Sequence, residues 1–357
     1  MKAEDPNAAA ASALDATSAA FEVVHHLDTV NAYYNSFRVA AASLRVSHVA
    51  YIQESSSINL KKRKRKASPA SLSLRLPSPD LLAKLEAVRR HALPSVPTLL
   101  PSYINLATST TSSTADPPPT KWASSHTSLA STFMDSLQEN TSDDDTLIMH
   151  ANQQYILPRH SAFVLGDVFR LPPLPSIHRF IVMDPPWENK TVARGSTYTT
   201  MPHTRLVHVD IPALAHPDGC LLAIWVTNKP AYSDFIHQTL LPRWGFAYLQ
   251  TWYWLKVAGN GDCVTPLSSS HKLPFEKVLL AGRGSFACTS IPDKVLVSVP
   301  LRHSWKPPLL PSVAPFGIDE KDDAKLEIFA RELRPHWTCV GNEVQTIIIH
   351  PSFFIPN

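Results

Sequence analysis

The chain has 357 residues, of which 44% are hydrophobic and 18% are charged, so it can bury a sizeable core in one large domain or two ordinary ones. Its formal net charge of +3 is too small by itself to indicate nucleic-acid binding. The four cysteines lie far apart without a C-x-x-C pair, which argues against a disulfide framework or a zinc site and favours reduced thiols. The sequence has no stretch approaching the roughly 20 apolar residues of a membrane span, so we expect neither a membrane segment nor a bound metal.

The first part of the chain, residues 1–107, is mixed in composition and is expected to be irregular. It begins with an Ala-rich segment that carries acidic residues and so does not resemble a secretory signal. Asp80–Arg90 has the pattern of a short helix. Residues 108–146 are rich in Ser, Thr and Pro. Few of them can contribute to a core, so we expect a mobile linker or a surface excursion there.

A basic run of six consecutive cations, Lys61–Lys66, lies within the first region. Such a block must stay solvated, because its charges cannot all be buried. It is typical of a nuclear-import signal; non-specific contact with phosphates and a solvated loop without a partner are the alternatives. We therefore expect a nuclear protein.

From residue 147 to residue 357, apolar runs alternate with helical patterns. The expected helices are Pro230–Leu241 and Lys321–Glu332, and Leu221–Val226 is continuously apolar, as in a central strand covered on both faces. The alternation predicts a Rossmann-like α/β domain, with a parallel or mixed sheet and helices on both faces. The expected strands are Ala162–Gly166, Phe180–Met183, Cys220–Val226, Phe246–Lys256, Lys277–Leu280, Val295–Val299, Thr338–Val340 and Ile347–Ile349.

The most informative motif is the tetrapeptide Asp184-Pro185-Pro186-Trp187, which follows the apolar run Phe180–Met183. It places a stiff polar loop at the carboxyl end of a strand, where an open α/β sheet binds ligands. An aspartate can accept a hydrogen bond from an amine, two prolines fix the backbone, and a tryptophan can stack on a base. The motif favours an enzyme that acts on the exocyclic amine of a nucleobase. A Pro-Pro turn beside a buried tryptophan is the alternative.

Two other common catalytic signatures are missing from the sequence. It has only 10 glycines and neither a G-x-G-x-x-G motif nor a Gly-rich phosphate loop, so a dinucleotide or a nucleoside triphosphate is not the expected cofactor. It also lacks the G-x-S-x-G elbow of many serine hydrolases. What remains is a set of polar residues at the ends of the expected strands and helices.

Short stretches that follow one another through the second half of the chain match one known family in their order. They are Tyr155–Asp167, Asp184–Val192, Ile211–Asn228, Pro266–Glu276, Ile291–Pro300, His303–Leu309, Leu326–Arg331 and Trp337–Val344. In combination they resemble the MT-A-seventy family of S-adenosylmethionine-dependent adenine methyltransferases, over a little more than half of the chain. The resemblance implies a Rossmann-like methyltransferase sheet, S-adenosylmethionine as the cofactor, and adenine in RNA or DNA as the substrate.

Carried over position by position, the resemblance also implies roles for individual residues. Asp184, Pro185, Pro186 and Trp187 would form the catalytic loop. The implied cofactor residues are Asp167 and Val168 beside the cofactor's adenine, Lys306 at its carboxylate, Arg331, Asn342 and Glu343 at its ribose, Phe329 nearby, and Asp184. A carboxylate needs a cation, which agrees with the lysine. Candidate contacts to the substrate are Trp187, Lys190, Arg194, His203 and Lys272.

The chemistry of the catalytic loop leads to a hypothesis for the mechanism. The N6 amine of adenine is a poor nucleophile, because its lone pair is delocalised into the ring. Asp184 would accept one N–H and the Pro185 carbonyl the other, which would aim the lone pair at the methyl group. Positioning would then supply much of the rate. Trp187 would stack on a base that is extruded or single-stranded.

Two alternatives to this enzyme stay open at the level of the sequence. The chain could be a non-catalytic nucleic-acid-binding scaffold with a methyltransferase fold, although the intact Asp-Pro-Pro-Trp loop favours catalysis. It could also methylate a protein side-chain amide, because an amide nitrogen presents the same lone-pair problem. The sequence does not distinguish RNA, such as small nuclear RNA, from DNA, nor a monomer from a protein that works with a partner subunit.

Overall fold

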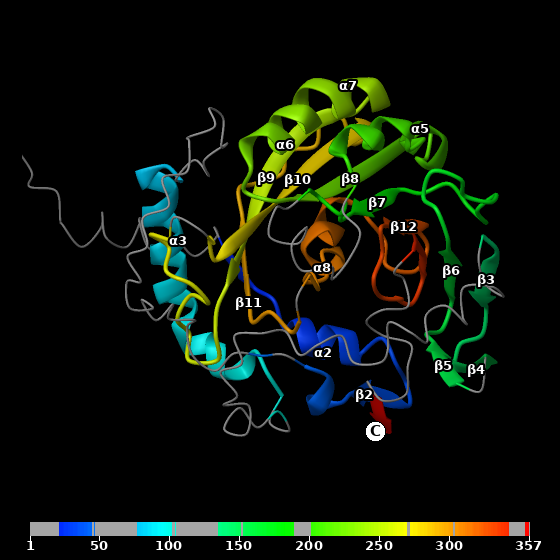
Figure 1. The fold of residues 1–357 in the computed structure, drawn as a ribbon, viewed down its shortest axis with the longest axis horizontal. Coiled ribbons are helices and arrows are strands. Elements are labelled where there is room, and N and C mark those ends of the chain that lie inside the picture. Colours follow the sequence, from blue (N-terminus) through cyan, green and yellow to red (C-terminus); the bar gives the residue numbers. More distant parts are fainter. Residues whose placement is uncertain are drawn as a thin grey trace, which may run out of the picture.

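The fold is taken from a computed structural model of the 357-residue chain (Figure 1). Numbering follows the full sequence. The residues that the structure describes are 21–44, 46, 77–101, 104, 135–150, 153–188, 201–269, 272–302, 304–342 and 354–356. The basic run Lys61–Lys66 and the expected strand Ile347–Ile349 lie outside them.

A ten-stranded sheet forms the centre of the molecule, and most of its neighbouring strands run parallel. The antiparallel junctions are β9–β10, β10–β8 and β6–β3. Every residue of β6, β7, β8, β11, β12 and β13 is buried, which fits strands covered on both faces. In spatial order the strands are β1 (Phe21–Val23), β11 (Val295–Ser298), β9 (Ala247–Lys256), β10 (Phe275–Gly284), β8 (Gly219–Val226), β7 (Phe180–Met183), β12 (Lys325–Ile328), β13 (Trp337–Gly341), β6 (Ser161–Leu165) and β3 (Leu137–Asn140).

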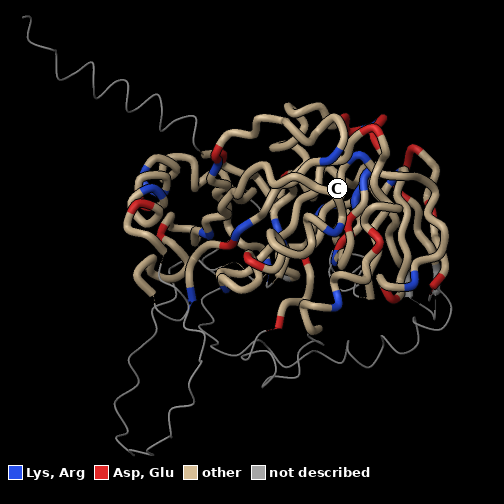
Figure 2. Tube along the Cα trace, turned by 90° about the horizontal axis from the view of Figure 1, so that it is seen from above, with Lys and Arg blue, Asp and Glu red and all other residues tan. Residues whose placement is uncertain are grey.

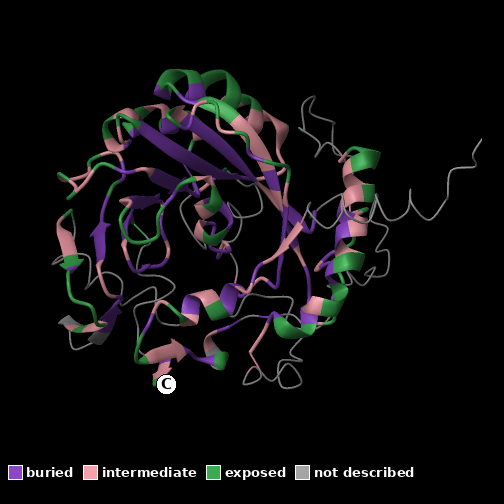
Figure 3. Ribbon diagram, turned by 180° about the vertical axis from the view of Figure 1, so that it is seen from behind, coloured by how far each residue is buried: buried purple, intermediate pink, exposed green. Residues whose placement is uncertain are grey.

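Helices cover both faces of this sheet, as the sequence predicted. Alternate residues of β8 enter different cores: Leu221, Ala223 and Trp225 pack with α8 (Leu310–Val313), while the residues between them pack beneath the helical segment 230–244. Figure 3 shows the buried strands between helices with exposed outer faces. The helical segment consists of α6 (Pro230–Phe235), a π-helical turn η6 (Ile236–Leu240) and α7 (Leu241–Trp244).

The sequence explains where this helical segment begins and ends. Pro230 occupies the first helical turn, where its missing N–H costs nothing. Gly245 ends the segment in the left-handed conformation, with φ of 72°. The expected helix Pro230–Leu241 is therefore confirmed and extends to Trp244. Shorter elements, α5 (Ile211–Leu214) and η5 (His203–His208), lie on the same face.

The N-terminal residues are part of the sheet and its packing. β1 pairs in parallel with β11, and α3 (Pro79–Ala92), capped by Ser78, packs its buried Leu85 and Val88 with residues of β11. α2 (His26–Asn31) follows β1, and β2 (Phe37–Val39) pairs with β14 (Phe354–Pro356) near the C-terminus. The short 3-10 turns η1 (Ala41–Ser43) and η2 (Leu93–Thr98) complete this region.

The expected linker 108–146 is described only from residue 135 onward. There it forms the edge strand β3, which pairs with β6, and the start of a hairpin of β4 (Thr146–His150) and β5 (Gln153–Leu157). Leu137–Asn140 is therefore part of the sheet, while residues 141–144 are exposed. Its residues pair with a buried strand although their composition is polar, because an edge strand needs only one covered face.

The expected helix Lys321–Glu332 is wrong. Lys325–Ile328 forms β12, which lies between β7 and β13 in the sheet. Its Lys325 and Glu327 are both buried and paired. The ammonium of Lys325 donates to the carbonyl oxygens of Asp319, Glu320 and Asp323, and Glu327 faces Arg334. Tertiary pairing thus overrides the local pattern.

Within the described residues, no helix is long and apolar enough to span a membrane. The same residues contain no cluster of three His, Cys, Asp or Glu side chains that could hold a metal ion. Figure 2 shows Lys and Arg interspersed with Asp and Glu along the described chain, in keeping with the small net charge of +3.

Candidate active site

The parallel strands end together at one edge of the sheet. In the strand register Leu165 pairs with Gly341, Ile328 with Met183, and Met183 with Ile224. The residues that follow these strands are therefore brought side by side. They are Asp167 and Val168 after β6, Asn342 after β13, Phe329 after β12, Asp184 after β7 and Asn228 after β8. An open α/β sheet binds its ligands at this carboxyl edge.

The catalytic loop is tied to the sheet at Asp184. Its backbone N–H donates to the carbonyl oxygen of Ile328 at 3.3 Å, and its side chain is buried. The Pro185 carbonyl accepts from the Trp187 N–H at 2.8 Å, and the Pro186 carbonyl accepts from the Met201 N–H at 3.2 Å. The prolines thus fix the loop through their restricted φ and through these two hydrogen bonds.

Trp187 is held by the end of β8 and the first turn of α6. Its indole N–H donates to the Trp225 carbonyl at 2.9 Å, and its ring stacks on Tyr232 with centroids 4.7 Å apart. The Tyr232 hydroxyl donates to the Glu188 carbonyl at 2.7 Å and accepts from the Lys229 ammonium at 2.9 Å. Trp187 is 7% exposed, so one indole face and the N–H are already used by the protein. Stacking of the other face on a substrate base stays a prediction.

Lys306 lies between two carboxylates. Its Nζ is 3.2 Å from Asp184 and 3.0 Å from Glu276, and its side chain is 11% exposed. Glu276 also pairs with Lys256. Burial opposes ionisation of Glu276, but the two ammonium groups outweigh it and hold its pKa well below the ordinary value. Burial likewise lowers the pKa of Lys306, and the two carboxylates more than compensate, so that its pKa is raised.

Glu276 was not predicted as a site residue. Two sequence signals point to it: Glu276 ends the matching stretch Pro266–Glu276, and it is a carboxylate near the start of a strand with a buried apolar centre. Asn228 was also missed. Its amide N–H donates to the Phe275 carbonyl at 2.6 Å, and its buried Oδ1 has no hydrogen-bond partner among the residues that the structure describes. Such an acceptor favours a ligand that brings a donor.

The other expected cofactor residues gather at the ends of β6, β13 and β12. The Gly166 N–H donates to the Gly341 carbonyl at 3.2 Å, and the Ala330 N–H to the Val340 carbonyl at 3.0 Å. These bonds bring together Asp167, Val168, Phe329, Arg331 and Asn342. Asp167 and Asn342 are exposed, Val168 is buried, and Arg331 is half-buried. Phe329 adopts a positive φ of 62°, which turns the chain sharply after β12. Glu343 lies outside the described residues.

Of the expected substrate contacts, the structure describes Trp187, His203 and Lys272. His203 pairs with Glu188 at 2.8 Å and packs against Tyr232, at the rim of the catalytic loop. Lys272 is exposed, on the loop that leads into β10. Lys190 and Arg194 lie outside the part of the chain that the structure describes. His203 is thus beside the loop, and the roles of the three cations stay predictions.

Comparison with known proteins identifies the domain that carries this edge. Residues 178–343 match the sequence model of the MT-A70 family. They form an MT-A70 domain. The matched range includes the catalytic loop and Lys306, and the resemblance predicted from the sequence is confirmed.

The MT-A70 domain also aligns with curated relatives. The chain is 38% identical over 233 residues to N(6)-adenine-specific methyltransferase METTL4 of Homo sapiens, covering 61% of this chain and 48% of that protein. It is 35% identical over 208 residues to N6-methyladenosine RNA methyltransferase MTA1 of Pyricularia oryzae, covering 54% of each. It is 35% identical over 198 residues to DNA N6-methyl methyltransferase of Caenorhabditis elegans, covering 53% of each. The chain thus spans about half the length of the curated relatives that it matches.

A buried polar network in the MT-A70 domain holds Trp305, the residue before Lys306. Trp305 donates its indole N–H to Glu332 at 2.6 Å, and Arg334 pairs with both Glu332 and Glu327. Burial raises the pKa of Glu327 to about 7, against the opposing charge of Arg334. The ring of His26, on α2, meets the Trp305 ring edge-on at 5.1 Å. The N-terminal helix therefore packs directly behind the site.

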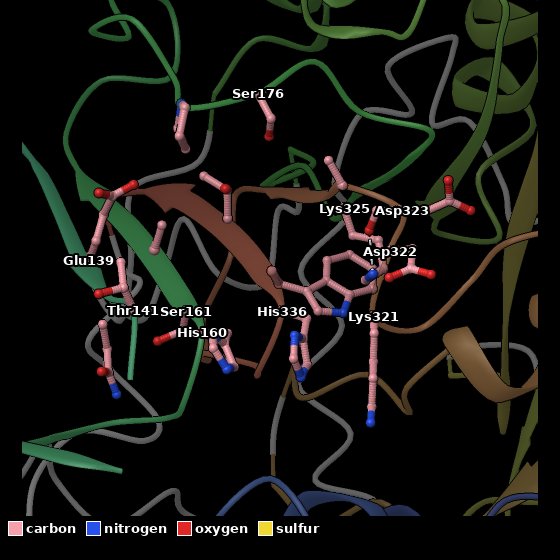
Figure 4. A pocket seen from close by; sticks show the side chains of 16 residues that line it. Glu139, Thr141, His160, Ser161, Ser176, Lys321, Asp322, Asp323, Lys325 and His336 are labelled. Atoms are coloured by element: carbon pink, nitrogen blue, oxygen red, sulfur yellow. Dashed lines mark hydrogen bonds between the residues drawn. The ribbon is translucent and has the colours of Figure 1, made fainter. Parts of the chain in front are cut away.

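A pocket of about 500 Å³ lies at the opposite edge of the sheet. Figure 4 shows its lining at the amino ends of β6, β12 and β13. The rings of His160 and His336 stack there at 5.0 Å. Because the catalytic loop follows the carboxyl end of β7, which runs parallel to β12, this pocket is separate from the candidate active site of the MT-A70 domain.

Proposed function

We propose that this chain transfers a methyl group from S-adenosylmethionine to the N6 amine of adenine in a nucleic acid. The observation that carries the proposal is the buried carboxylate of Asp184, at the carboxyl edge of a mostly parallel sheet and followed by two prolines that fix its loop. The names of the relatives, which describe adenine N6 methylation of RNA and of DNA, support the same reaction.

The residues at the strand ends fit S-adenosylmethionine. Asp167 and Asn342, exposed and adjacent, offer acceptors and donors for ribose hydroxyls or an adenine edge. Lys306 offers a cation for a carboxylate, although in this structure its ammonium faces Asp184 and Glu276. Arg331 follows β12, which lies between β13 and β7 in the sheet. It therefore lies between Asn342, which follows β13, and Asp184, which follows β7 and faces Lys306. When bound, S-adenosylmethionine supplies an electrophilic methyl group on its sulfonium.

The chain's own residues orient the amine. Asp184 accepts one N–H of the adenine amine, and Lys306 beside it keeps that carboxylate in place. The Pro185 carbonyl accepts the other N–H through its second lone pair, because the first accepts from Trp187. Two acceptors on one amine fix the direction of its lone pair, and holding reacting groups in one geometry is worth several orders of magnitude in rate.

The substrate that we propose is an adenine in RNA or DNA, presented as a single strand or extruded from a duplex. His203 and Lys272 are proposed to contact its backbone. The basic run Lys61–Lys66 supports a nuclear location and adds charge for phosphate contact.

The test is an Asp184→Ala variant. We expect methyl transfer to fall by at least a thousandfold while calorimetry shows cofactor binding within a few-fold of the wild type. Asp218→Ala, at an aspartate whose side chain is 82% exposed, is the matched control and should retain full activity. Full activity of Asp184→Ala would remove this carboxylate from the mechanism. Absence of cofactor binding by the wild type at millimolar concentration would favour a non-catalytic scaffold.

A further inference from the structure

We propose that Tyr232 is a positioning residue that sets the catalytic loop through its hydroxyl group. The inference rests on the proposed methyl transfer and adds to it a residue outside the Asp-Pro-Pro-Trp motif. Tyr232 lies on α6, is 1% exposed, and contacts both residues that end the described part of the loop, Trp187 and Glu188.

The loop is anchored at two separate places. At its beginning Asp184 is tied to β12 and to Lys306. At its end Trp187 and Glu188 are tied to the segment from Trp225 to Tyr232. The distance between the Asp184 carboxylate and the Trp187 indole ring therefore depends on how the segment from Trp225 to Tyr232 holds Trp187 and Glu188. Catalytic geometry tolerates errors of only a fraction of an ångström.

The direction of each hydrogen bond follows from its chemistry. The Lys229 ammonium can only donate, so the Tyr232 oxygen accepts from it at 2.9 Å. The hydroxyl hydrogen is then free to donate to the Glu188 carbonyl at 2.7 Å. Lys229 also lies 4.5 Å from the centroid of the Tyr232 ring. A positive charge beside the phenol polarises its O–H and strengthens the bond to the loop.

The hydroxyl and the ring of Tyr232 make different contacts with the loop. The ring stacks on Trp187 with an interplanar angle of 25°, and phenylalanine would preserve that contact. The hydroxyl connects α6 to the backbone of Glu188. Tyr232→Phe therefore removes the positioning bond and leaves the packing in place, and Lys229→Met removes the ammonium that donates to the hydroxyl and orients the bond.

The first measurement is steady-state kinetics on an oligonucleotide that the wild type methylates. We expect Tyr232→Phe to lower kcat roughly tenfold, with the KM for the oligonucleotide and the cofactor affinity changed less than twofold. Lys229→Met should lower kcat by a smaller factor, and the double variant should be no worse than Tyr232→Phe alone, because both act through one bond. If Tyr232→Phe changed only the KM for the oligonucleotide, or left kcat unchanged, the proposal would be overturned.

The second measurement does not depend on activity. Hydrogen–deuterium exchange of the segment 184–188 should be faster in Tyr232→Phe than in the wild type, while exchange in β7 stays the same. Tyr34→Phe is the matched control, because that buried hydroxyl has no hydrogen-bond partner among the described residues. Equal exchange at the loop in all three proteins would refute the role of Tyr232. A wild type that methylates no oligonucleotide would refute the proposed function instead.

Discussion

Replacing Lys306 by methionine tests the electrostatic arrangement of the site most severely. The ammonium lies within 3.2 Å of Asp184 and 3.0 Å of Glu276, in a place where its side chain is 11% exposed. Methionine has a similar length and fills a similar volume, so the change removes the charge more than the packing. Two carboxylates that shared a cation would then face each other, with only Lys256 left beside Glu276.

The expected cost follows from the distances. At an effective dielectric constant near 20, each charge pair at about 3 Å contributes about 5 kcal/mol of attraction. The desolvation of the ammonium, several kcal/mol, offsets much of this gain. Removing one partner of a buried pair nevertheless costs about 3–5 kcal/mol, because the remaining charge stays buried without its partner. We expect a loss of that size in the free energy of unfolding at neutral pH.

The assay is chemical denaturation of Lys306→Met and wild type across pH. The pKa of Glu276 is lowered in the folded protein from an ordinary value of 4.5, so its stabilising contribution is present above that pH and is lost as the pH falls below it. The gap between the two proteins should therefore be largest above about pH 5 and narrow at lower pH. Adding Glu276→Gln to the variant should restore part of the loss.

The control for this experiment is Lys294→Met. Lys294 pairs with Glu22 at 2.7 Å, but the carboxylate side chain there is 30% exposed. A pair of this kind contributes about 1 kcal/mol or less. A loss below 1 kcal/mol in Lys306→Met, or a loss equal to that of the control, would refute the reasoning.

Three further changes have expected outcomes. Asn228→Ala should raise the KM for nucleic acid several-fold with little change in the melting temperature, if its unpaired oxygen accepts from the substrate; an unchanged KM would contradict this role. His26→Phe should make stability less sensitive to acid, because burial, with Arg334, lowers the pKa of His26 to about 3. The wild type then loses stability as the pH falls below the ordinary pKa of 6.5, where the histidine of the unfolded chain takes up a proton. Identical profiles of stability against pH for the two proteins would contradict this account. Gly284→Ala should cost more than about 1 kcal/mol in the free energy of unfolding, because its φ is 57° and a Cβ would lie 2.4 Å from the Asp218 carbonyl; a neutral result in thermal melts would count against that geometry.

Much of the central sheet could be predicted from apolar runs. The continuous run Leu221–Val226 became the fully buried β8, and Phe180–Met183 became β7 with the bounds expected. β12 could not be predicted, because its lysine and glutamate are buried and find their partners in the turn before the strand and in Arg334 after it. Local patterns cannot show that a charge is paired by tertiary structure.

The N-terminal strands could not be predicted either. β1 contains only three residues and gains its place by pairing with β11, which lies more than 270 residues further along the chain. β3 consists mostly of polar residues and is defined by its partner β6. Short edge strands carry little periodicity of their own, so their existence depends on the sheet that they join.

The candidate site was predictable where a motif marks a strand end. The catalytic loop and Lys306 were both expected as site residues. The structure places Lys306 beside Asp184, and its expected contact with the cofactor's carboxylate stays a prediction. Glu276 and Tyr232 were not, because their roles depend on contacts that only the folded chain makes. Residue type at a strand end is visible in the sequence, and the partner across the sheet is not.

The most direct test of the central claim is the identity of the methylated product. Matched RNA and DNA oligonucleotides would be incubated with the protein and isotopically labelled S-adenosylmethionine, digested to nucleosides and analysed by mass spectrometry. The account predicts labelled N6-methyladenine nucleoside from the wild type and none from Asp184→Ala. Label on another base or on the protein alone, or equal labelling by both proteins, would contradict it.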